Sequence, residues 1–542
     1  MHPRPAKDTE ALAVYTNPVY RHSFPDPFVL KYAGRYYAYA TGSGEDGVFL
    51  VLTSDDLVNW RDVGHAMPLP KTPAMHYWAP EVTYSEGKFN LYYSVGHEIL
   101  MELRVAVAEN PEGPFGDASV KLTTQDFAID PHVFTDRDGM RWMFYATDFL
   151  DYSHIGTGTV IDKMQSWTKL EGKPRPVTRA KFDWQVYDPE RKEKGGVRWH
   201  TVEGPAVIER KGVYFEMFSG GNWQNSSYGV SFAVSDDLKS KVEWQQYADG
   251  ERTLPIIRTT PEVHGPGHNS IVCGPNGREL YCVYHRWTDS GRVMAIDRMD
   301  VVGRRLYVVG PTTTPQPAPL RSKDVPTELP SSCLIEFIAA TKGKIRLLDS
   351  AGKELCSFKT AAAREYRLEI DGRWCHVVAD GWETLFSEHL SGRATKLDAS
   401  GDNQNARITP GFEDLFDRGE IAKSDWRIIT GTVCDERDRQ LFLTAGDTTG
   451  GIGREQQFDE IEMVVNAGLE TSDSPSAFGL ALYDANGEQV FSMLVSADGV
   501  DVIGSSEAAF PLPTDWDLSE LHAYRIMTRG GKVSVWLEQY FL

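Results

Sequence analysis

The sequence predicts an all-β protein, a five-bladed β-propeller followed by a β-sandwich region of lectin or jelly-roll type. A repeat unit returns five times before about residue 310, and each unit holds two apolar stretches around a tight turn that contains glycine. Glycine supplies the positive φ of such turns, and the flanking residues are aromatic or β-branched, so each pair of stretches is an expected hairpin. No helical periodicity of useful length separates the units.

The five units share an opening pattern. Each begins with an acidic or histidine-containing turn, enters a short apolar strand and returns through an aromatic strand. They read DPFVLKYAGRYYAYAT from Asp26, APEVTYSEGKFNLYYSV from Ala79, DPHVFTDRDGMRWMFYAT from Asp130, EGPAVIERKGVYFEMFSG from Glu203 and GHNSIVCGPNGRELYCVYHRW from Gly267. A radial array of four-stranded sheets explains this recurrence, whereas one large β-sandwich would not repeat the opening motif.

The repeat sets the expected domain boundaries. The propeller domain is predicted over residues 1–312, and the Pro-rich residues 313–330 are expected to form a linker because proline cannot continue a sheet. Beyond the linker a weaker repeat appears, in which LLDSAGKELCSF resembles LYDANGEQVFSM. Its alternating strands predict a β-rich module over 331–408 and a β-sandwich module over 409–542, or one composite sandwich made of both.

Composition narrows the expected partners and location. The formal net charge of −21 disfavours nucleic acid and anionic membranes, but an uncharged oligosaccharide or plant polysaccharide meets no such repulsion. No apolar run approaches the roughly 18 residues of a membrane span. The first twelve residues lack the apolar core of a secretory signal, which predicts a cytoplasmic protein unless a signal was removed. The six cysteines form no C-x-x-C pair, so a zinc ribbon or redox motif is not expected.

The repeat also predicts a catalytic site. Aligning the units brings together their first acidic or histidine positions, which are Asp26, Glu81, Asp130, Glu203 and His268. Equivalent positions on rotationally repeated blades converge on one end of the central channel, where clustered carboxylates shift each other's pKa. Hydrolysis of a glycoside needs two carboxyl groups across the scissile bond, and a third can hold the acid protonated. Asp26, Asp130 and Glu203 fit this need, although an Asp-Pro pair taken singly often only begins a turn.

Five ordered motifs carry a family resemblance. The stretches SFPDPFVLKYAGRYYAYAT, YWAPEVTYSEGKFNLYYSV, FAIDPHVFTDRDGMRWMFYA, VEGPAVIERKGVYFEMFSGG and GPGHNSIVCGPNGRELYCVYHRW resemble glycoside hydrolase family 43 over about residues 16–312. The resemblance implies an inverting mechanism on arabinose- or xylose-containing glycans. Asp26 would be the general base that activates water, Glu203 the general acid, and Asp130 the group that raises the pKa of the acid and orients it. It implies no cofactor for the chemistry.

The same resemblance suggests further site residues, each with a structural alternative. Arg292, in GRVMAID, would bind substrate, and the alternative is a surface charge on a strand. Trp78 would stack on a sugar ring or belong to the core, and Trp223 in GGNW is a weaker candidate of the same kind. His268 would help to hold a water-coordinated Ca²⁺ in the channel, or it is a channel histidine that holds no ion.

The expected function is therefore an inverting glycosidase, with an exo-acting α-L-arabinofuranosidase or β-xylosidase as the first choice. The exo preference rests on the missing signal, because a cytoplasmic enzyme would meet imported oligosaccharides. The alternatives are an endo-arabinanase with a long open groove and a non-catalytic carbohydrate-binding propeller. The non-catalytic alternative predicts that at least one of the three carboxylates is missing, and all three are present.

Overall fold

A computed structural model describes most of the chain. The described residues are 13–319 except 72, 86, 137, 211 and 249–252; 329–410 except 381–382 and 402; and, farther on, 427–428, 432–437, 440–445, 452–453, 462–469, 477–484, 488–504, 507–512, 516–519, 522–529, 532–538 and 540–542. Residues 411–426, where the sequence predicts the second module to begin, lie outside the described residues, as do residues 320–328 of the expected linker.

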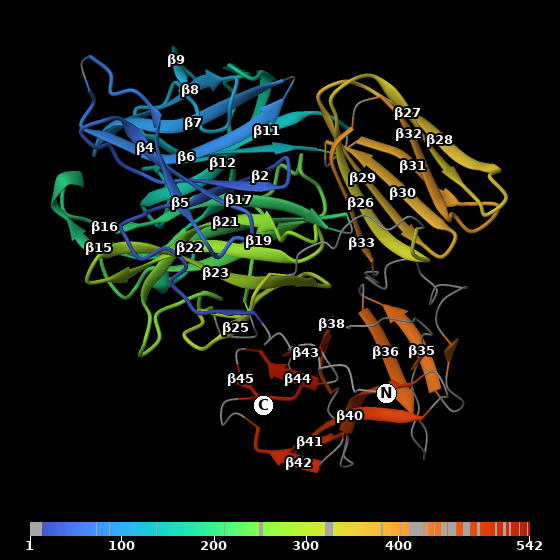
Figure 1. The fold of residues 1–542 in the computed structure, drawn as a ribbon. Coiled ribbons are helices and arrows are strands. Elements are labelled where there is room, and N and C mark those ends of the chain that lie inside the picture. The colour runs from blue at the N-terminus through green and yellow to red at the C-terminus, as the bar shows by residue number, and fades with distance from the viewer. Residues whose placement is uncertain are drawn as a thin grey trace, which may run out of the picture. The chain divides into compact units, whose positions relative to one another are not determined.

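The first part of the structure is a ring of five antiparallel sheets, as predicted (Figure 1). Blade 1 holds β2 (Phe28–Tyr32), β3 (Arg35–Tyr39), β4 (Val48–Ser54) and β5 (Arg61–Met67). Blade 2 holds β6 (His76–Ser85), β7 (Lys88–His97), β8 (Leu100–Ala108) and β9 (Gly116–Lys121). Blade 3 holds β10 (Ala128–Thr135), β11 (Arg141–Phe149), β12 (Gly156–Ser166), β13 (Lys169–Leu170) and β14 (Arg175–Arg179).

The remaining two blades complete the ring. Blade 4 holds β17 (Val202–Arg210), β18 (Val213–Gly220), β19 (Gly229–Ser235) and β20 (Gln245–Gln246). Blade 5 holds β21 (His264–Cys273), β22 (Leu280–Thr288), β23 (Gly291–Val302) and β24 (Arg305–Val308). The innermost strands β2, β6, β10, β17 and β21 each contact the next in that order, and β21 contacts β2. Two short strands, β1 (Val14–Tyr15) and β25 (Gln316–Pro317), flank the five sheets in sequence.

An extra hairpin extends blade 3. It consists of β15 (Val186–Arg191) and β16 (Val197–His200), with the short 3-10 helices η1 (Asp183–Gln185) and η2 (Lys192–Lys194) beside them. β16 pairs with the start of β12 and leads directly into β17, so the hairpin stands where blade 3 meets blade 4. No helix in the described part of the chain is long and apolar enough to cross a membrane.

The hydrophobic core is divided among the five blade interfaces. Each interface buries its own cluster: Phe49 and Tyr93 between blades 1 and 2, Leu103 and Met143 between 2 and 3, Phe144 and Phe218 between 3 and 4, Phe215 and Tyr284 between 4 and 5, and Tyr36 and Ile296 between 5 and 1. The apolar alternation of each strand therefore faces a neighbouring blade, which is the packing that a propeller requires.

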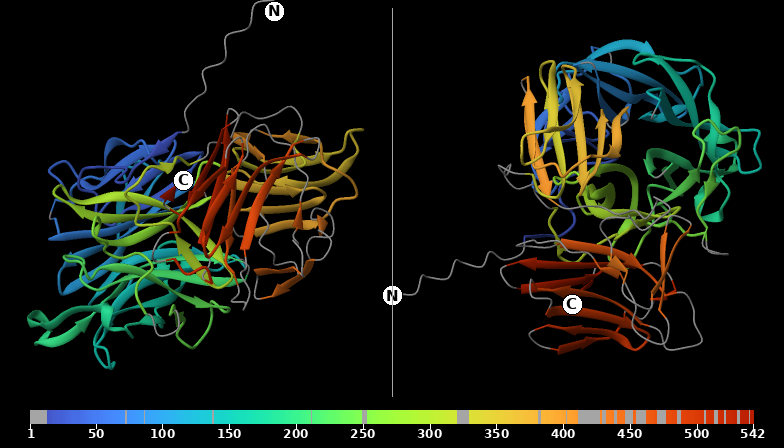
Figure 2. Two further views of the ribbon diagram at one scale, coloured as in Figure 1. Left: turned by 90° about the horizontal axis from the view of Figure 1, so that it is seen from below. Right: turned by 90° about the vertical axis from the view of Figure 1, so that its right-hand side faces the viewer.

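Residues 329–410 form a two-sheet sandwich, drawn yellow to orange in Figure 2. One sheet orders its strands as β31 (Glu383–His389), β30 (Trp374–Ala379), β29 (Arg364–Asp371), β26 (Ser332–Ala339) and β33 (Asn403–Pro410). The other orders them as β28 (Glu354–Thr360), β27 (Gly343–Leu348) and β32 (Lys396–Ser400). Their facing side chains, among them Ile335, Leu347 and Leu368, form a separate buried core.

This sandwich contacts the propeller at the turns that follow β2 and β21. Arg407 donates to the Gly34 carbonyl at 2.8 Å, Arg367 donates to the Gly277 carbonyl at 2.9 Å, and Arg278 pairs with Glu369 at 3.0 Å. These turns lie at the opposite end of the innermost strands from the predicted carboxylates, since Asp26 precedes β2, and Asp130 and Glu203 are among the first three residues of β10 and β17. The sandwich therefore covers the face of the propeller remote from the predicted site.

The later strands form two four-stranded sheets that share a buried core. One sheet holds β38 (Glu462–Ala467), β43 (His522–Arg529), β44 (Lys532–Leu537) and β45 (Tyr540–Phe541), and the other holds β39 (Ala477–Tyr483), β40 (Gln489–Ser496), β41 (Gly499–Ile503) and β42 (Glu507–Phe510). Shorter pieces are β34 (Arg427–Ile428), β35 (Thr432–Arg437), β36 (Gln440–Ala445) and β37 (Ile452–Gly453). The chain divides into two compact units: one holds the five blades, the 329–410 sandwich and the hairpin β35–β36, and the other holds β34 and β37–β45.

A buried carboxylate joins the segment before blade 1 to the last blade. Asp297 of β23 is fully buried and accepts hydrogen bonds from Asn17 Nδ2 at 3.1 Å, Tyr284 Oη at 2.7 Å and both the Thr312 N–H and hydroxyl, at 3.1 and 2.6 Å. Burial raises the pKa of Asp297 to about 6, although these donors favour its charged form. The ring is thus tied together where the first blade meets the fifth.

We expect Asp297→Ala to destabilise the protein by on the order of 3 kcal/mol, because it leaves several buried donors without their acceptor. Thermal unfolding followed by tryptophan fluorescence measures the effect. The control is Asp55→Ala, which removes a pair with Arg35 whose side chains are 44% and 69% exposed and should cost less than about 1 kcal/mol. Equal unfolding temperatures for the two variants would show that Asp297 does not tie the ring.

Candidate functional site

The site is built on a backbone kink that recurs at the start of each innermost strand. One residue per blade has a positive φ there: Asp26 at 50°, Ala79 at 43°, Asp130 at 59°, Gly204 at 59° and His268 at 49°. In blades 2 to 5 the strand pairing skips at this residue, which marks a β-bulge. A bulge re-aims the side chains beside it, and here it turns them into the central channel.

The kink corrects the predicted alignment of the carboxylates. Asp26, Asp130 and His268 occupy equivalent positions, but the equivalents in blades 2 and 4 are Ala79 and Gly204 rather than Glu81 and Glu203. Glu203 stands one residue before the kink. Glu81 stands two residues after it and binds His132 Nδ1 at 2.8 Å and the Val133 N–H at 2.8 Å. Glu81 is therefore a bridge between blades 2 and 3, which sequence spacing alone could not distinguish from a site carboxylate.

Asp26 is held as an anion. Its Oδ1 lies 2.7 Å from Arg292 Nη1, 3.2 Å from His285 Nδ1 and 3.6 Å from His268 Nδ1. Burial pushes the pKa of Asp26 upward, but the Arg292 guanidinium outweighs it and holds that pKa well below its usual range. Burial also lowers the pKa of both histidines, to about 4 for His285, so Arg292 supplies the lasting positive charge.

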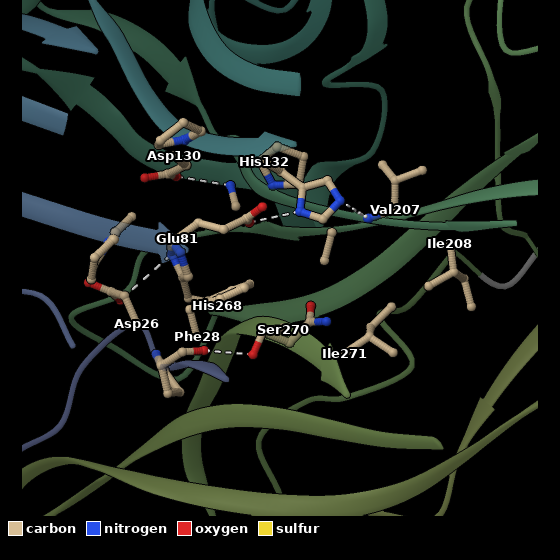
Figure 3. Close-up of a pocket in the computed structure, with 18 residues that line it drawn as sticks. Asp26, Phe28, Glu81, Asp130, His132, Val207, Ile208, His268, Ser270 and Ile271 are labelled. Atoms are coloured by element: carbon tan, nitrogen blue, oxygen red, sulfur yellow. Dashed lines mark hydrogen bonds and ion pairs between the residues drawn. The ribbon is translucent and has the colours of Figure 1, made fainter. Parts of the chain in front are cut away.

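Asp130 and Glu203 form a second, protonated group of carboxyls. Asp130 Oδ2 accepts the Gly204 N–H at 2.9 Å, so it bonds to the peptide unit that joins Glu203 to Gly204 (Figure 3, dashed line from Asp130). Burial and the charges of Glu203 and Asp26 raise the pKa of Asp130. Burial raises the pKa of Glu203 to about 7. Because the two carboxyls repel as anions, the pair keeps a proton at neutral pH.

Tyr228, which the sequence did not single out, orients Glu203. Its hydroxyl donates to Glu203 Oε1 at 2.8 Å, and its ring stacks on His285 with centroids 5.7 Å apart and planes 8° apart. A Cβ on Gly267 would lie 2.0 Å from the Tyr228 ring, so position 267 must be glycine for the tyrosine to reach Glu203. Tyr228 follows a serine and His285 follows a tyrosine inside the repeat units. Neither dipeptide forms a pattern that marks a site residue in a single sequence.

Arg292 and Trp223 lie together at the rim beside Asp26. The Arg292 guanidinium carbon stands 4.6 Å from the Trp223 ring centroid, and Trp223 stacks on Trp287 at 6.0 Å and 12°. Arg292 is 15% exposed and paired with Asp26, so it is not the surface charge of the alternative interpretation. Trp78 is half-buried, stacks on His76 and packs against the cluster that contains Met101 and Phe127, while its neighbour Ala79 lines the channel.

The channel around His268 offers few ligands for the expected Ca²⁺ ion. Among the described residues no group of three or more His, Cys, Asp or Glu side chains is arranged to hold a metal ion. Beside His268, the Asn269 Oδ1 is buried and has no hydrogen-bond partner in the described structure. Ca²⁺ prefers six to eight oxygen ligands, so these residues fit only an ion whose shell is mostly water. His268 as a calcium residue stays a prediction.

Comparison with known proteins gives a consistent match to the propeller. The sequence profile of glycosyl hydrolases family 43 matches residues 15–304. A β-D-galactofuranosidase of Aspergillus niger is 28% identical over 309 residues, covering 52% of this chain and 81% of that protein. An extracellular exo-α-(1→5)-L-arabinofuranosidase of Streptomyces chartreusis is 27% identical over 304 residues, covering 52% and 83%. A solved thermostable family-43 glycoside hydrolase is 32% identical with a TM-score of 0.49, covering 56% of this chain and 99% of that one.

We expect Gly267→Ala to destabilise the protein by about 1–3 kcal/mol, since the added methyl group overlaps the buried Tyr228 ring. The control is Gly116→Ala, where the added carbon would meet only the Val107 carbonyl at 3.8 Å. Thermal unfolding of both variants measures the difference. A Gly267→Ala protein as stable as the control would contradict the packing of Tyr228 described above.

Proposed function

The chain belongs to glycosyl hydrolases family 43, and on that premise we propose that it is an inverting, exo-acting glycosidase specific for α-L-arabinofuranosides, with β-xylosides as the second choice. Its substrates would be oligosaccharides or plant polysaccharides that contain arabinose or xylose. The two relatives named above act on furanosides, one of them in an exo manner, and this supports a furanoside over a xylopyranoside.

One observation carries the catalytic proposal: two carboxyls that act on each other's charge, the buried Asp26 and the partly buried Glu203, have pKa values moved in opposite directions. Asp26 stays ionised beside Arg292, whereas Glu203 has a pKa of about 7 and is protonated in a large share of molecules at neutral pH. Glycosidases separate base and acid in this way. Asp26 would take a proton from water as that water attacks the anomeric carbon, and Glu203 would give its proton to the leaving oxygen. The chemistry needs no cofactor.

Asp130 and Arg292 would assist without exchanging protons with the substrate. Asp130 is anchored on the Gly204 N–H, which favours its charged form, and in that form its charge would favour the protonated form of Glu203. Arg292 keeps Asp26 ionised, and with Trp223 it offers a charged and aromatic wall for a sugar. The stacking of Trp78 on a sugar ring and the binding of a hydrated Ca²⁺ beside His268 are also proposed, and both rest on the family resemblance.

The blade 3 hairpin supports exo action over an open endo-acting groove. It leads directly into Glu203, and Asn222 Nδ2, from the rim loop of blade 4, donates to the Tyr187 carbonyl of the hairpin at 3.0 Å. The rim is thus bridged beside the proposed acid, where a long polysaccharide would otherwise pass.

The function is tested with 4-nitrophenyl α-L-arabinofuranoside, β-D-xyloside and β-D-galactofuranoside, and with an arabino- and a xylo-oligosaccharide. We expect Glu203→Gln to lower kcat on the oligosaccharide by about 10²–10⁴-fold, and by less on the aryl glycosides because nitrophenol leaves without help. Asp26→Asn should lose activity on both. The control Glu209→Gln, at the far end of the same strand β17, should keep wild-type rates.

Proton NMR of the first product reports the anomer, and inversion is expected. Equal losses by Glu203→Gln on aryl glycosides and oligosaccharides would remove Glu203 from the acid role. A wild-type protein that releases internal oligomers from linear arabinan would favour the endo-arabinanase, and one inactive on every substrate would overturn the proposed specificity.

The pH dependence should follow the two carboxyls. Activity should fall as pH rises through about 7, because Glu203 must be protonated, and should persist to low pH because Asp26 has a depressed pKa. Arg292→Met removes the charge beside Asp26, so the acidic limb of kcat/KM should move about 1–3 units higher. The control Arg305→Met, on the outer strand β24, should leave the profile unchanged. An unmoved acidic limb in Arg292→Met would contradict the assignment of Asp26.

A further inference from the structure

The kinked residues are linked by a hydrogen-bond rule that runs around the ring. In four of the five cases, the N–H of the kinked residue donates to a side chain of the preceding blade, which lies on the second strand or, for Thr41, two residues after the end of that strand. The pairs are Ala79 to Thr41 Oγ1 at 2.8 Å, Asp130 to Ser94 Oγ at 2.9 Å, His268 to Ser219 Oγ at 2.8 Å and Asp26 to His285 Nδ1 at 3.2 Å. These N–H groups face the interior, so each needs an acceptor.

The four acceptors occupy one structural position. In three blades the strand register places the acceptor opposite the residue that precedes the kink of its own blade: Ser94 lies opposite Trp78, Ser219 opposite Glu203 and His285 opposite Gly267. Thr41 takes the same place in blade 1, because its N–H donates to the carbonyl of Pro25, the residue before Asp26, at 3.0 Å. This position recurs in every blade, so a side chain there can accept the N–H of the kinked residue in the next blade.

Blade 3 breaks this rule. Its residue at this position, opposite Ile129, is Ala146, which has no acceptor and is fully buried. The hydroxyl of the adjacent Thr147 is directed to the Phe127 carbonyl at 2.7 Å. The N–H that lacks its usual acceptor belongs to Gly204, and Asp130 Oδ2 accepts it instead.

We propose that Ala146 is a positioning residue: by offering no acceptor, it leaves the Gly204 N–H to Asp130 and so fixes the Asp130 carboxylate against the peptide of Glu203. This inference rests on the proposed roles of Asp130 and Glu203 in glycoside hydrolysis. A serine at 146 would supply the acceptor that the other blades use. Asp130 would then lose the donor that favours its charged form, and the shared proton would move from Glu203 toward Asp130.

If Ala146 only fills space, the effect of a substitution should depend on side-chain volume and not on whether the new side chain accepts a hydrogen bond. Ala146 packs in a small cluster with Met101, Phe127 and Ile129, so any change of volume could disturb the fold. Ala146→Cys provides the matched control, because a thiol is larger than a methyl group but is a weak acceptor. Ala146→Gly adds no acceptor and only removes volume. If packing alone matters, Ala146→Ser should resemble these two variants.

The experiment measures kcat and KM against pH for wild type, Ala146→Ser, Ala146→Cys and Ala146→Gly, on an arabino-oligosaccharide and on 4-nitrophenyl α-L-arabinofuranoside. For Ala146→Ser we expect a fall in kcat of about tenfold on the oligosaccharide, comparable with the loss of one charged hydrogen bond, and little change in KM. The loss should be smaller on the aryl glycoside, and the basic limb of the profile, which follows Glu203, should move to lower pH. The cysteine and glycine variants should keep the wild-type pH profile.

Thermal unfolding of each variant separates misfolding from mispositioning. A folded Ala146→Ser protein with the wild-type profile, or a shift shared equally by all three variants, would overturn the role of Ala146. Either result would leave the proposed function intact, since wild-type activity and its loss in Glu203→Gln are measured on the same substrates. A failure of the proposed function would instead appear as an inactive wild type.

Discussion

Two buried carboxyl groups, Asp26 and Asp130, lie close enough to the partly buried Glu203 for their charges to act on one another, and the protein must hold the three together although they repel each other. Each receives a different kind of compensation: a guanidinium for Asp26, a peptide N–H for Asp130 and a phenol hydroxyl for Glu203. The guanidinium stabilises a full negative charge, whereas the neutral donors stabilise it less and leave the other two carboxyls able to share a proton. In the proposed mechanism, the difference in partners is therefore what separates the base Asp26 from the acid Glu203.

The surrounding architecture serves to fix these partners. Arg292, His285 and Tyr228 come from blades 4 and 5, while Asp26 and Asp130 come from blades 1 and 3, so the site exists only when the ring is closed. The five interblade cores hold the strands at a fixed radius, and Asp297 ties the segment before blade 1 to blade 5. The sandwich of residues 329–410 binds the opposite face, where it supports the turns of blades 1 and 5 without reaching the carboxylates.

The sequence predicted the blades and their number, because strand repeats are local patterns that survive in one chain. It also singled out Asp26, Asp130 and Glu203 by their acidic openings, and their catalytic roles stay a prediction. The sequence alignment wrongly placed Glu81 and Glu203 at positions equivalent to Asp26 and Asp130. A one-residue bulge shifts the residues that follow it, and the alternation of apolar residues does not reveal such a bulge. Tyr228 and His285 were missed because their importance comes from contacts between blades. Arg292 was found by resemblance, but its pairing with Asp26 spans most of the propeller and has no local sequence pattern.

The left-handed backbone at the start of each innermost strand has a consequence for which amino acids the channel can present. Positive φ is strained for most side chains, and glycine, aspartate, asparagine and histidine tolerate it best. The five positions hold Asp, Ala, Asp, Gly and His, so all but Ala79 come from this short menu. These residue types include an acid and an imidazole, which are groups that can act on a proton. Steric limits on the main chain thus favour a small set of side chains at the five positions where the backbone turns into the channel.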